Sequence, residues 1–183
     1  KNTYPKLTTK NVESIWQSHQ RILKSLTRLG KSNSDKNTMQ PYSSIYSKLL
    51  KIIPNLIEHI REGKTYGKSE KGPDSGLMSL NYDFIREDKN GNYIIALSHY
   101  FEQNGDMVAD PDMQIRIFPE QEVAEAMTFQ DQFGYKEVYR EKDGKEYVDL
   151  RRKKDLNQFL KQWLTNLINQ GHKIDLTFKN QSR

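Results

Sequence analysis

The chain contains two kinds of hydrophobic pattern, one typical of helices and one typical of strands. Apolar residues recur at helical spacing over residues 9–29, over residues 43–62 and after Asp155, which predicts three amphipathic helices. Pro54 interrupts the second stretch and removes a helical hydrogen bond, so this stretch is predicted to kink or to divide into two abutting helices. Asp155 is the predicted N-cap of the last helix, and Gly171 is its predicted stop.

The hydrophobic period changes to two in the middle of the chain. An apolar run that begins at Tyr93 predicts a strand covered on both faces. Alternating apolar positions predict further strands at residues 78–84, 113–118, 123–130, 134–140 and 145–149. For residues 122–127 a helix is the alternative. Asn-Gly and Asp-Gly pairs between these segments predict hairpins. The expected fold class is therefore α+β, with a single antiparallel β-meander sheet of about five strands, helices packed on it and an N-terminal helical arm.

Polar, turn-forming residues divide the chain into parts. Residues 31–41 (KSNSDKNTMQP) favour a linker, and residues 64–76 favour a flexible loop. We therefore expect an N-terminal helix and linker over residues 1–41, an α+β core domain over residues 42–175 and a C-terminal tail over residues 176–183.

Charge is distributed unevenly along the chain. Residues 1–72 carry 14 Lys or Arg and 5 Asp or Glu, residues 73–150 carry 7 and 17, and residues 151–183 carry 8 and 2. The two basic ends suit either a contact with nucleic acid or packing against the acidic middle. The absence of cysteine excludes disulfides and thiolate metal sites, and it suits a cytoplasmic protein. The chain has no apolar run of about 18 residues, so we expect no membrane-spanning helix.

The densest basic run lies directly before the last predicted helix. Cations at that position oppose the helix dipole, so stabilising the helix does not explain them. A contact with a phosphate backbone does explain them, and the alternative is that they meet the acidic sheet. The candidate nucleic-acid-binding residues are Lys48, Lys51, Arg151, Arg152, Lys153 and Lys154. No DNA-reading or RNA-reading motif accompanies them.

The densest cluster of other polar residues spans residues 99–113. Its carboxylates are the ligands that Mg²⁺ or Ca²⁺ prefers. The metal candidates are Asp106, Asp110 and Asp112. His99 and Asp106 are the catalytic candidates, with Asp83 as the partner carboxylate that a histidine base would need. Turn chemistry alone also explains the Asp and Gly residues, and His99 shares a face with apolar residues, as a hydrogen-bonded core histidine would.

Three segments resemble an uncharacterised bacterial family, the domain of unknown function number 6908. They are residues 96–113 (ALSHYFEQNGDMVADPDM), 137–139 (EVY) and 155–164 (DLNQFLKQWL). The resemblance covers about residues 45–172. The order LLKIIP, strands and then N-x-F-L-x-x-W-L is also similar to a second uncharacterised bacterial family, number 1249. The resemblance implies a cytoplasmic protein of bacteria, encoded on plasmids and conjugative elements. It brings no known activity and therefore assigns no functional residues.

Two hypotheses about function follow from the sequence. The chain has no hydrolase elbow, phosphate-binding loop or dinucleotide-binding fingerprint. The leading hypothesis is a non-enzymatic accessory protein of a bacterial mobile element that binds protein or nucleic acid, with no cofactor and no membrane. The alternative is a divalent-metal-dependent enzyme that uses the segment of His99, Asp106, Asp110 and Asp112. The oligomeric state is not predicted.

Overall fold

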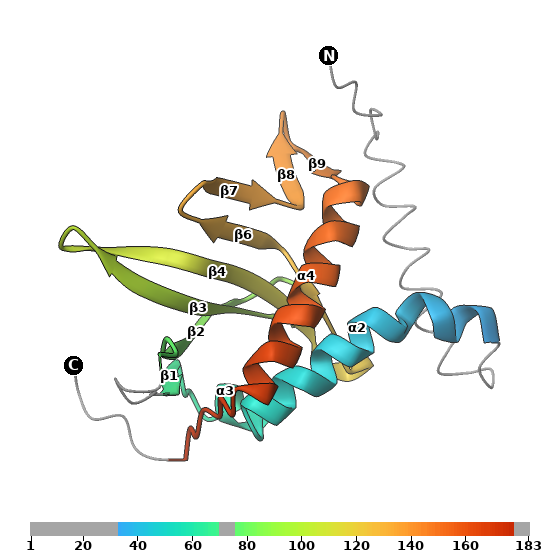
Figure 1. Cartoon of the computed structure of the whole chain (residues 1–183). Helices are drawn as coiled ribbons and strands as arrows, with labels where there is room; N and C mark the ends of the chain where they lie inside the picture. The colour runs from blue at the N-terminus through green and yellow to red at the C-terminus, as the bar shows by residue number, and fades with distance from the viewer. Residues whose placement is uncertain (1–32, 70–75, 178–183) are drawn as a thin grey trace.

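The structure is a computed structural model that describes residues 33–69 and 76–177. The helix predicted over residues 9–29 lies outside the described residues, as do residues 178–183 of the predicted tail. The helices and strands follow one another in the order α2 (Asn33–Ile52), α3 (Leu56–Arg61), β1 (Tyr66–Ser69), β2 (Leu80–Glu87), β3 (Tyr93–Gln103), β4 (Asp106–Phe118), η2 (Pro119–Gln121), β5 (Val123–Ala126), β6 (Thr128–Asp131), β7 (Gly134–Glu137), β8 (Tyr139–Lys142), β9 (Lys145–Val148) and α4 (Leu150–Asn169) (Figure 1). The predicted α+β fold class is confirmed.

An antiparallel sheet of seven strands forms the centre of the described fold. Neighbouring strands follow the order β1-β2-β3-β4-β6-β7, and β5 also pairs with β4. In the described residues β8 and β9 form a separate two-stranded sheet. The sequence predicted about five strands because β1 lies in the expected loop at residues 64–76, and because one predicted strand at residues 123–130 is divided into β5 and β6.

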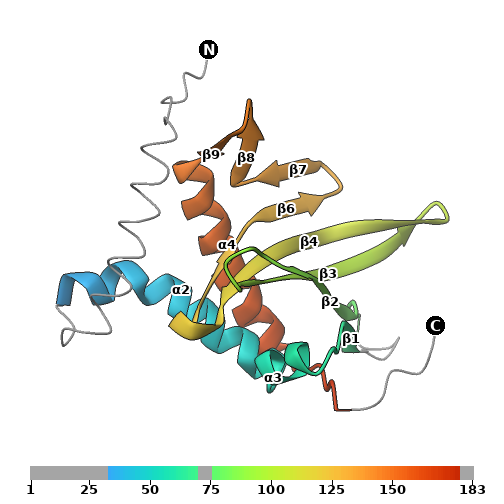
Figure 2. The same ribbon diagram turned by 180° about the vertical axis from the view of Figure 1, so that it is seen from behind.

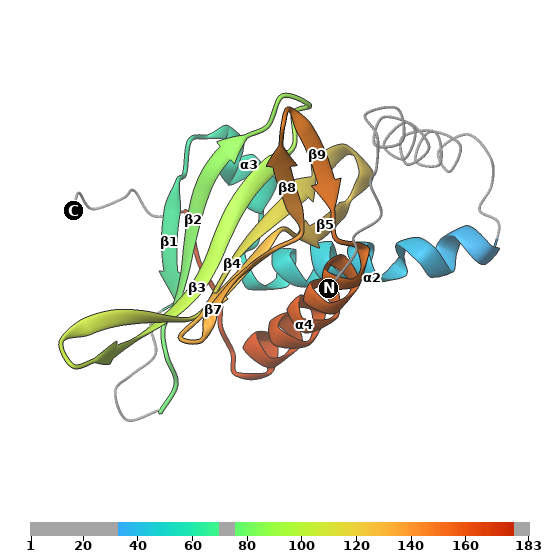
Figure 3. The same cartoon turned by 90° about the horizontal axis from the view of Figure 1, so that it is seen from above.

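The hairpin of β3 and β4 is long and projects beyond the helices (Figure 3). Its turn holds Asn104 at φ 56° and Gly105 at φ 88°. Both values lie in the left-handed region that tight hairpin turns require and that Asn and Gly adopt at low cost. The hairpin that this Asn-Gly pair predicted is therefore confirmed.

Helices α2, α3 and α4 cover one face of the sheet (Figure 2). Alternate residues of the strands point toward them, and the core between the two layers is apolar. Its fully buried members include Leu49, Ile53, Leu97, Ile115, Leu160 and Leu164. None of the helices in the described residues is long and apolar enough to cross a membrane.

The second helical stretch differs from its prediction at its start. Residues 33–41 form the first half of α2, with Pro41 inside the helix, and not a linker. The break at Pro54 is confirmed, because α2 ends at Ile52 and α3 begins at Leu56. Asn55 adopts the left-handed conformation between them.

The last helix begins earlier than predicted. Asp149 is its N-cap, and its carboxylate accepts a hydrogen bond of 2.9 Å from the Arg152 backbone N–H. The prediction that Asp155 caps this helix is therefore wrong, and Asp155 lies in the second turn of α4. Positive charges are unfavourable near a helix N-terminus. The sequence therefore predicted that the basic residues 151–154 precede the helix.

A buried asparagine joins α4 to the sheet. The Asn157 side-chain oxygen accepts a hydrogen bond of 2.9 Å from the Ala126 N–H, and its amide nitrogen donates one of 2.7 Å to the Lys153 carbonyl. Replacing Asn157 by alanine leaves a buried N–H without its acceptor. We expect Asn157→Ala to lower the free energy of unfolding by about 1–3 kcal/mol. Urea denaturation measures this loss, and the exposed Asn166→Ala, which lacks such a contact with the sheet, is the control; equal losses would contradict the role of Asn157.

Candidate functional site

The candidate metal ligands lie along one strand. Asp106 is next to the tip of the β3–β4 hairpin, whereas the Asp112 carboxylate accepts a hydrogen bond of 2.9 Å from the Tyr100 hydroxyl in the middle of the sheet. Six residues of extended strand separate them by about 20 Å. Within the described residues no group of three His, Cys, Asp or Glu side chains is placed to hold a metal ion. The structure therefore does not bring Asp106, Asp110 and Asp112 together.

His99 lies in the core, under α4. It is 5% exposed, and its Nδ1 atom lies 2.8 Å from the Ser79 carbonyl oxygen, to which it donates. Burial lowers the pKa of His99 below its usual range, against the opposing effects of the Ser79 contact and of Asp110. Asp83 pairs with Ala96 and so belongs to the opposite face of the sheet. Asp83 is therefore not the partner carboxylate of His99, and the buried His99 ring lacks the exposure to substrate that general-base catalysis requires.

The candidate nucleic-acid-binding cations do not form one patch. Lys51 precedes Ile52, whose carbonyl accepts a hydrogen bond of 2.8 Å from the Ile174 N–H, beyond the C-terminal end of α4. Arg151 lies in the first turn of α4, and that helix of 20 residues is about 30 Å long. Lys48 and Lys51 on α2 are thus nearer the opposite end of α4 from the run of four cations.

Two cations of this run are engaged inside the protein. Arg152 donates a hydrogen bond of 3.2 Å to the Glu137 carbonyl and pairs with Asp149. Lys153 is part of the buried charge cluster described below. Arg151 and Lys154 are exposed, so two of the four consecutive cations present open side chains to a phosphate backbone.

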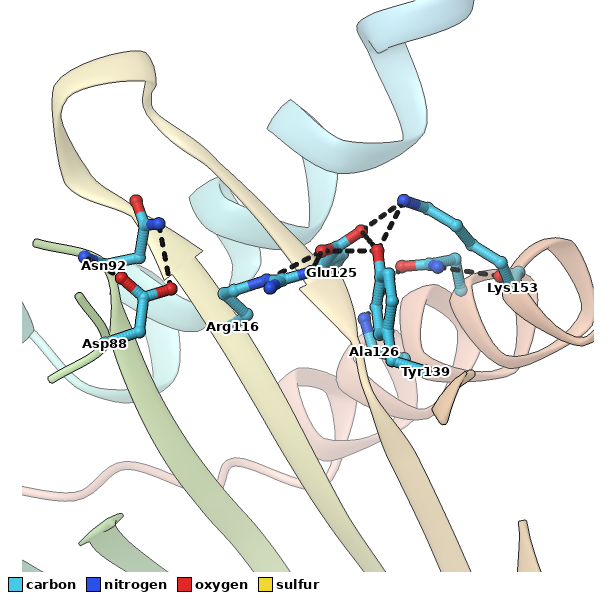
Figure 4. A network of polar contacts seen from close by, with 8 residues as sticks. Asp88, Asn92, Arg116, Glu125, Ala126, Tyr139 and Lys153 are labelled. Carbon is cyan, nitrogen blue, oxygen red and sulfur yellow. Dashed lines mark hydrogen bonds and ion pairs between the residues drawn. The ribbon is translucent and has the colours of Figure 1, made fainter. Parts of the chain in front are cut away.

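A buried charge cluster that was not predicted from the sequence consists of Glu125, Arg116, Lys153 and Tyr139 (Figure 4). One oxygen of the Glu125 carboxylate accepts a hydrogen bond of 2.9 Å from Arg116 Nε, and the other lies 2.7 Å from Lys153 Nζ. The Tyr139 hydroxyl donates to the same carboxylate at 2.9 Å, and its ring centroid lies 4.5 Å from the Arg116 guanidinium carbon. The cluster joins β4, β5, β8 and α4.

Electrostatics fix the charge states of this buried charge cluster. Burial alone would raise the pKa of Glu125, but the charges of Lys153 and Arg116 outweigh it and hold the pKa below its usual range. Burial raises the pKa of Tyr139 to about 12. Glu125 is therefore ionised and Tyr139 is a neutral donor near neutral pH. The one signal in the sequence was a charged residue inside the apolar run of residues 123–126.

Two exposed aromatic residues lie on the β6–β7 hairpin, and a third lies on α4. Phe133 at the hairpin turn is 86% exposed, Tyr135 on β7 is 57% exposed and Phe159 on α4 is 40% exposed. The ring of Phe159 meets that of Phe129 on β6 edge to face, with centroids 5.0 Å apart. Tyr135 pairs with Gln130 and Lys136 pairs with Phe129, so Tyr135 points to the face of the hairpin opposite Phe129 and Phe159. We call the two exposed aromatic residues of the hairpin, Phe133 and Tyr135, the aromatic surface.

The strand that carries Tyr135 is also the end of the sheet. β7 pairs with β6 along one edge, and in the part of the chain that the structure describes no strand pairs with its other edge. An unpaired edge presents N–H and C=O groups that a strand of another chain can bind. The aromatic surface and this free edge therefore lie on the same hairpin.

Comparisons with known proteins identify a family without a characterised activity. Neither a curated protein nor a solved structure matches the chain. The family model described as "Domain of unknown function (DUF6908)" matches residues 45–173. That range begins in α2 and ends in the segment after α4, so it includes both sheets and all the candidate residues. The chain therefore belongs to the DUF6908 family.

Proposed function

We propose that this protein is a non-enzymatic accessory protein that binds a macromolecule, and that the macromolecule is another protein. The observation that supports this proposal is the aromatic surface beside the free edge of β7. Large exposed aromatic side chains are over-represented at the centres of protein interfaces, where they supply most of the binding energy. A free sheet edge adds backbone hydrogen bonds to such a contact.

The candidate cations give weaker support to a nucleic-acid partner. Lys153 is held by Glu125, and Arg152 is engaged with Asp149. Binding to nucleic acid gains its free energy from cations that release counterions from phosphates, so an engaged lysine contributes little. The enzyme alternative is weaker still, because its carboxylates lie apart along β4 and its histidine is buried.

The proposal also includes the setting in which the protein acts. We propose that it works in the cytoplasm of bacteria, as a product of a mobile element. The absence of cysteine in the sequence and the family resemblance support this setting. Expression from the native gene, with detection in fractionated cells, tests the location.

Site-specific photo-crosslinking tests the protein partner. A benzoylphenylalanine residue in place of Phe133 is expected to give a discrete protein adduct in the cells that express the native gene. The same residue in place of Ile85, which is 45% exposed on β2, is the matched control and is expected to give none. Adding Tyr135→Ser to the Phe133 probe should reduce the adduct about tenfold, because truncating an interface aromatic residue costs more than about 1 kcal/mol.

Two outcomes would overturn the proposal. One is equal crosslinking from positions 133 and 85, which would indicate random encounters. The other is tight, salt-sensitive binding to short labelled DNA or RNA in a fluorescence-polarisation titration, lost when Arg151 and Lys154 are replaced by glutamine. That second result would make the protein a nucleic-acid accessory protein.

A further inference from the structure

The residues that follow α4 form a strap across the end of the fold. We call residues 172–177 the C-terminal strap. The Ile174 N–H donates a hydrogen bond of 2.8 Å to the Ile52 carbonyl of α2, and the Lys173 N–H donates one of 3.2 Å to Ser69 Oγ of β1. The side chains of Ile174 and Leu176 are buried. The strap therefore joins α2 to β1, the edge strand at the end opposite β7.

The contact between the strap and β1 is close. A Cβ atom at Gly67 would lie 2.4 Å from Leu176 Cδ2 and 2.6 Å from Ile174 Cγ2. These separations are shorter than van der Waals contact, so a glycine is needed for the strap to lie this near the strand. A small displacement of the strap would open this packing.

Three of the four histidines in the sequence lie near the strap. His172 begins the strap, and its ring centroid lies 5.4 Å from that of His99 on β3. The two side chains are 3% and 5% exposed. His172 Nδ1 lies 3.3 Å from Ser69 Oγ, whereas His99 Nδ1 contacts the Ser79 carbonyl. Two buried imidazoles thus face each other, and the Nδ1 atom of each contacts an uncharged oxygen.

Other charged groups lie near this pair. Asp110 of β4 acts on His99 and favours its protonated form. His59 of α3 has its own carboxylate, because its Nδ1 lies 3.3 Å from a Glu62 oxygen. Lys173 and Asp175 lie in the strap itself, and Trp163 of α4 contacts the His99 ring with centroids 5.6 Å apart.

Protonation of the pair opposes the strapped structure. Two positive rings about 5 Å apart repel each other strongly where water is scarce, and each loses its hydration. Burial lowers the pKa of His99 in the folded protein. The unfolded chain then binds more protons than the folded one. The free energy that holds the strap in place is therefore complete above the unfolded pKa of about 6.5, and part of it is lost as the pH falls below that value.

We propose that protonation of the His99–His172 pair releases the C-terminal strap from β1 and α2, which makes the strap a pH-sensitive element. Release at mildly acidic pH uncovers Gly67 and the edge of β1. This inference does not depend on the proposed protein partner, because it concerns the opposite edge of the sheet.

Hydrogen exchange of the full chain tests the strap. Amide protection is measured by mass spectrometry at pH 7.5 and pH 5.5, with exchange times corrected for the intrinsic pH dependence. Peptides covering residues 172–177 and 66–69 are expected to lose about tenfold in protection at the lower pH, because one histidine with the ordinary pKa of about 6.5 in the released strap is mostly protonated at pH 5.5 and mostly neutral at pH 7.5. A core peptide covering residues 113–118 is the internal reference and should change little.

Two variants separate the His99–His172 pair from other acid effects. His172→Phe keeps a ring in place and removes the second charge, so the acid-induced loss of protection should disappear. His59→Gln should retain the loss, because His59 lies on α3, contacts Glu62 and is not part of the pair. Unchanged protection of the strap in the native protein, or an unchanged pH effect in His172→Phe, would overturn the proposal.

A measurement on the native protein covers the case in which His172→Phe does not fold. An NMR titration of the histidine Cε1 protons is expected to give His99 an apparent pKa below the unfolded value of about 6.5, together with shifts of the strap amides over the same pH range. Titration of both rings at or above that value, with the strap amides unchanged, would overturn the proposal.

Discussion

Replacing Glu125 by glutamine is expected to lower the free energy of unfolding by about 3–5 kcal/mol. The substitution keeps the shape of the side chain and removes its charge. Arg116 and Lys153 then face each other without a buried counter-charge, and the Arg116 guanidinium cannot lose its proton to relieve the repulsion. Urea denaturation monitored by circular dichroism measures the change.

The acid profile of stability provides a second measure of the same residue. Because the pKa of Glu125 is lowered in the folded protein, its contribution is present above the unfolded value of about 4.3 and is lost as the pH falls through the folded value. Glu125→Gln should remove this part of the profile. Lys153→Met is the control, because the Glu125–Arg116 pair stays balanced and the loss should be smaller. Equal losses in the two variants would contradict the central role of the carboxylate.

Replacing Trp163 by alanine is expected to cost about 3–5 kcal/mol of the free energy of unfolding. Trp163 is buried between α4 and the sheet, where its ring meets those of His99 and Phe159. Its removal leaves a cavity that the long strand β3 cannot fill. Thermal and urea denaturation measure the loss.

Phe159→Ala is the matched control for Trp163. It lies one turn earlier on the same helix, and two fifths of its surface is already exposed. Its loss of stability should be clearly smaller. A loss as large as that of Trp163→Ala would contradict the larger contribution that we assign to the more deeply buried Trp163 ring.

Local patterns predicted the parts of the fold that local physics determines. The apolar stripe of α4 and the run at Tyr93 identified a helix and a central strand. Asn-Gly and Asp-Gly pairs identified two hairpin turns, because they suit the left-handed conformations seen at Asn104 and Asp143. The break at Pro54 follows from its missing N–H.

The predictions that were wrong concern β1 and the start of α4, where tertiary contacts override the conformational preference of the local sequence. β1 (Tyr66–Ser69) has a loop-like sequence, and its pairing with β2 makes it a strand. The first turn of α4 tolerates four cations because Asp149 caps it and Glu125 binds Lys153. Neither partner can be identified from neighbouring residues in the sequence, because Glu125 is distant from Lys153 along the chain.

The candidate functional residues also divide into those that local sequence patterns predict and those that tertiary contacts determine. The sequence left open whether His99 is a base or a core residue, and the burial that favours a core residue comes from α4 and the strap. The buried charge cluster was missed because alternation along β5 predicts only that Glu125 points away from the apolar core. The three residues that meet it come from β4, β8 and α4.

The backbone hydrogen bond from the Ile174 N–H to the Ile52 carbonyl has a consequence for synthesis on the ribosome. The helical layer over the sheet is built from α2 and α4, one from each end of the described chain. At about 5–20 residues per second, the strands emerge several seconds before α4 does. During that interval the nascent sheet exposes the apolar face that α4 later covers. Translation must therefore pass residue 174 before the fold can close.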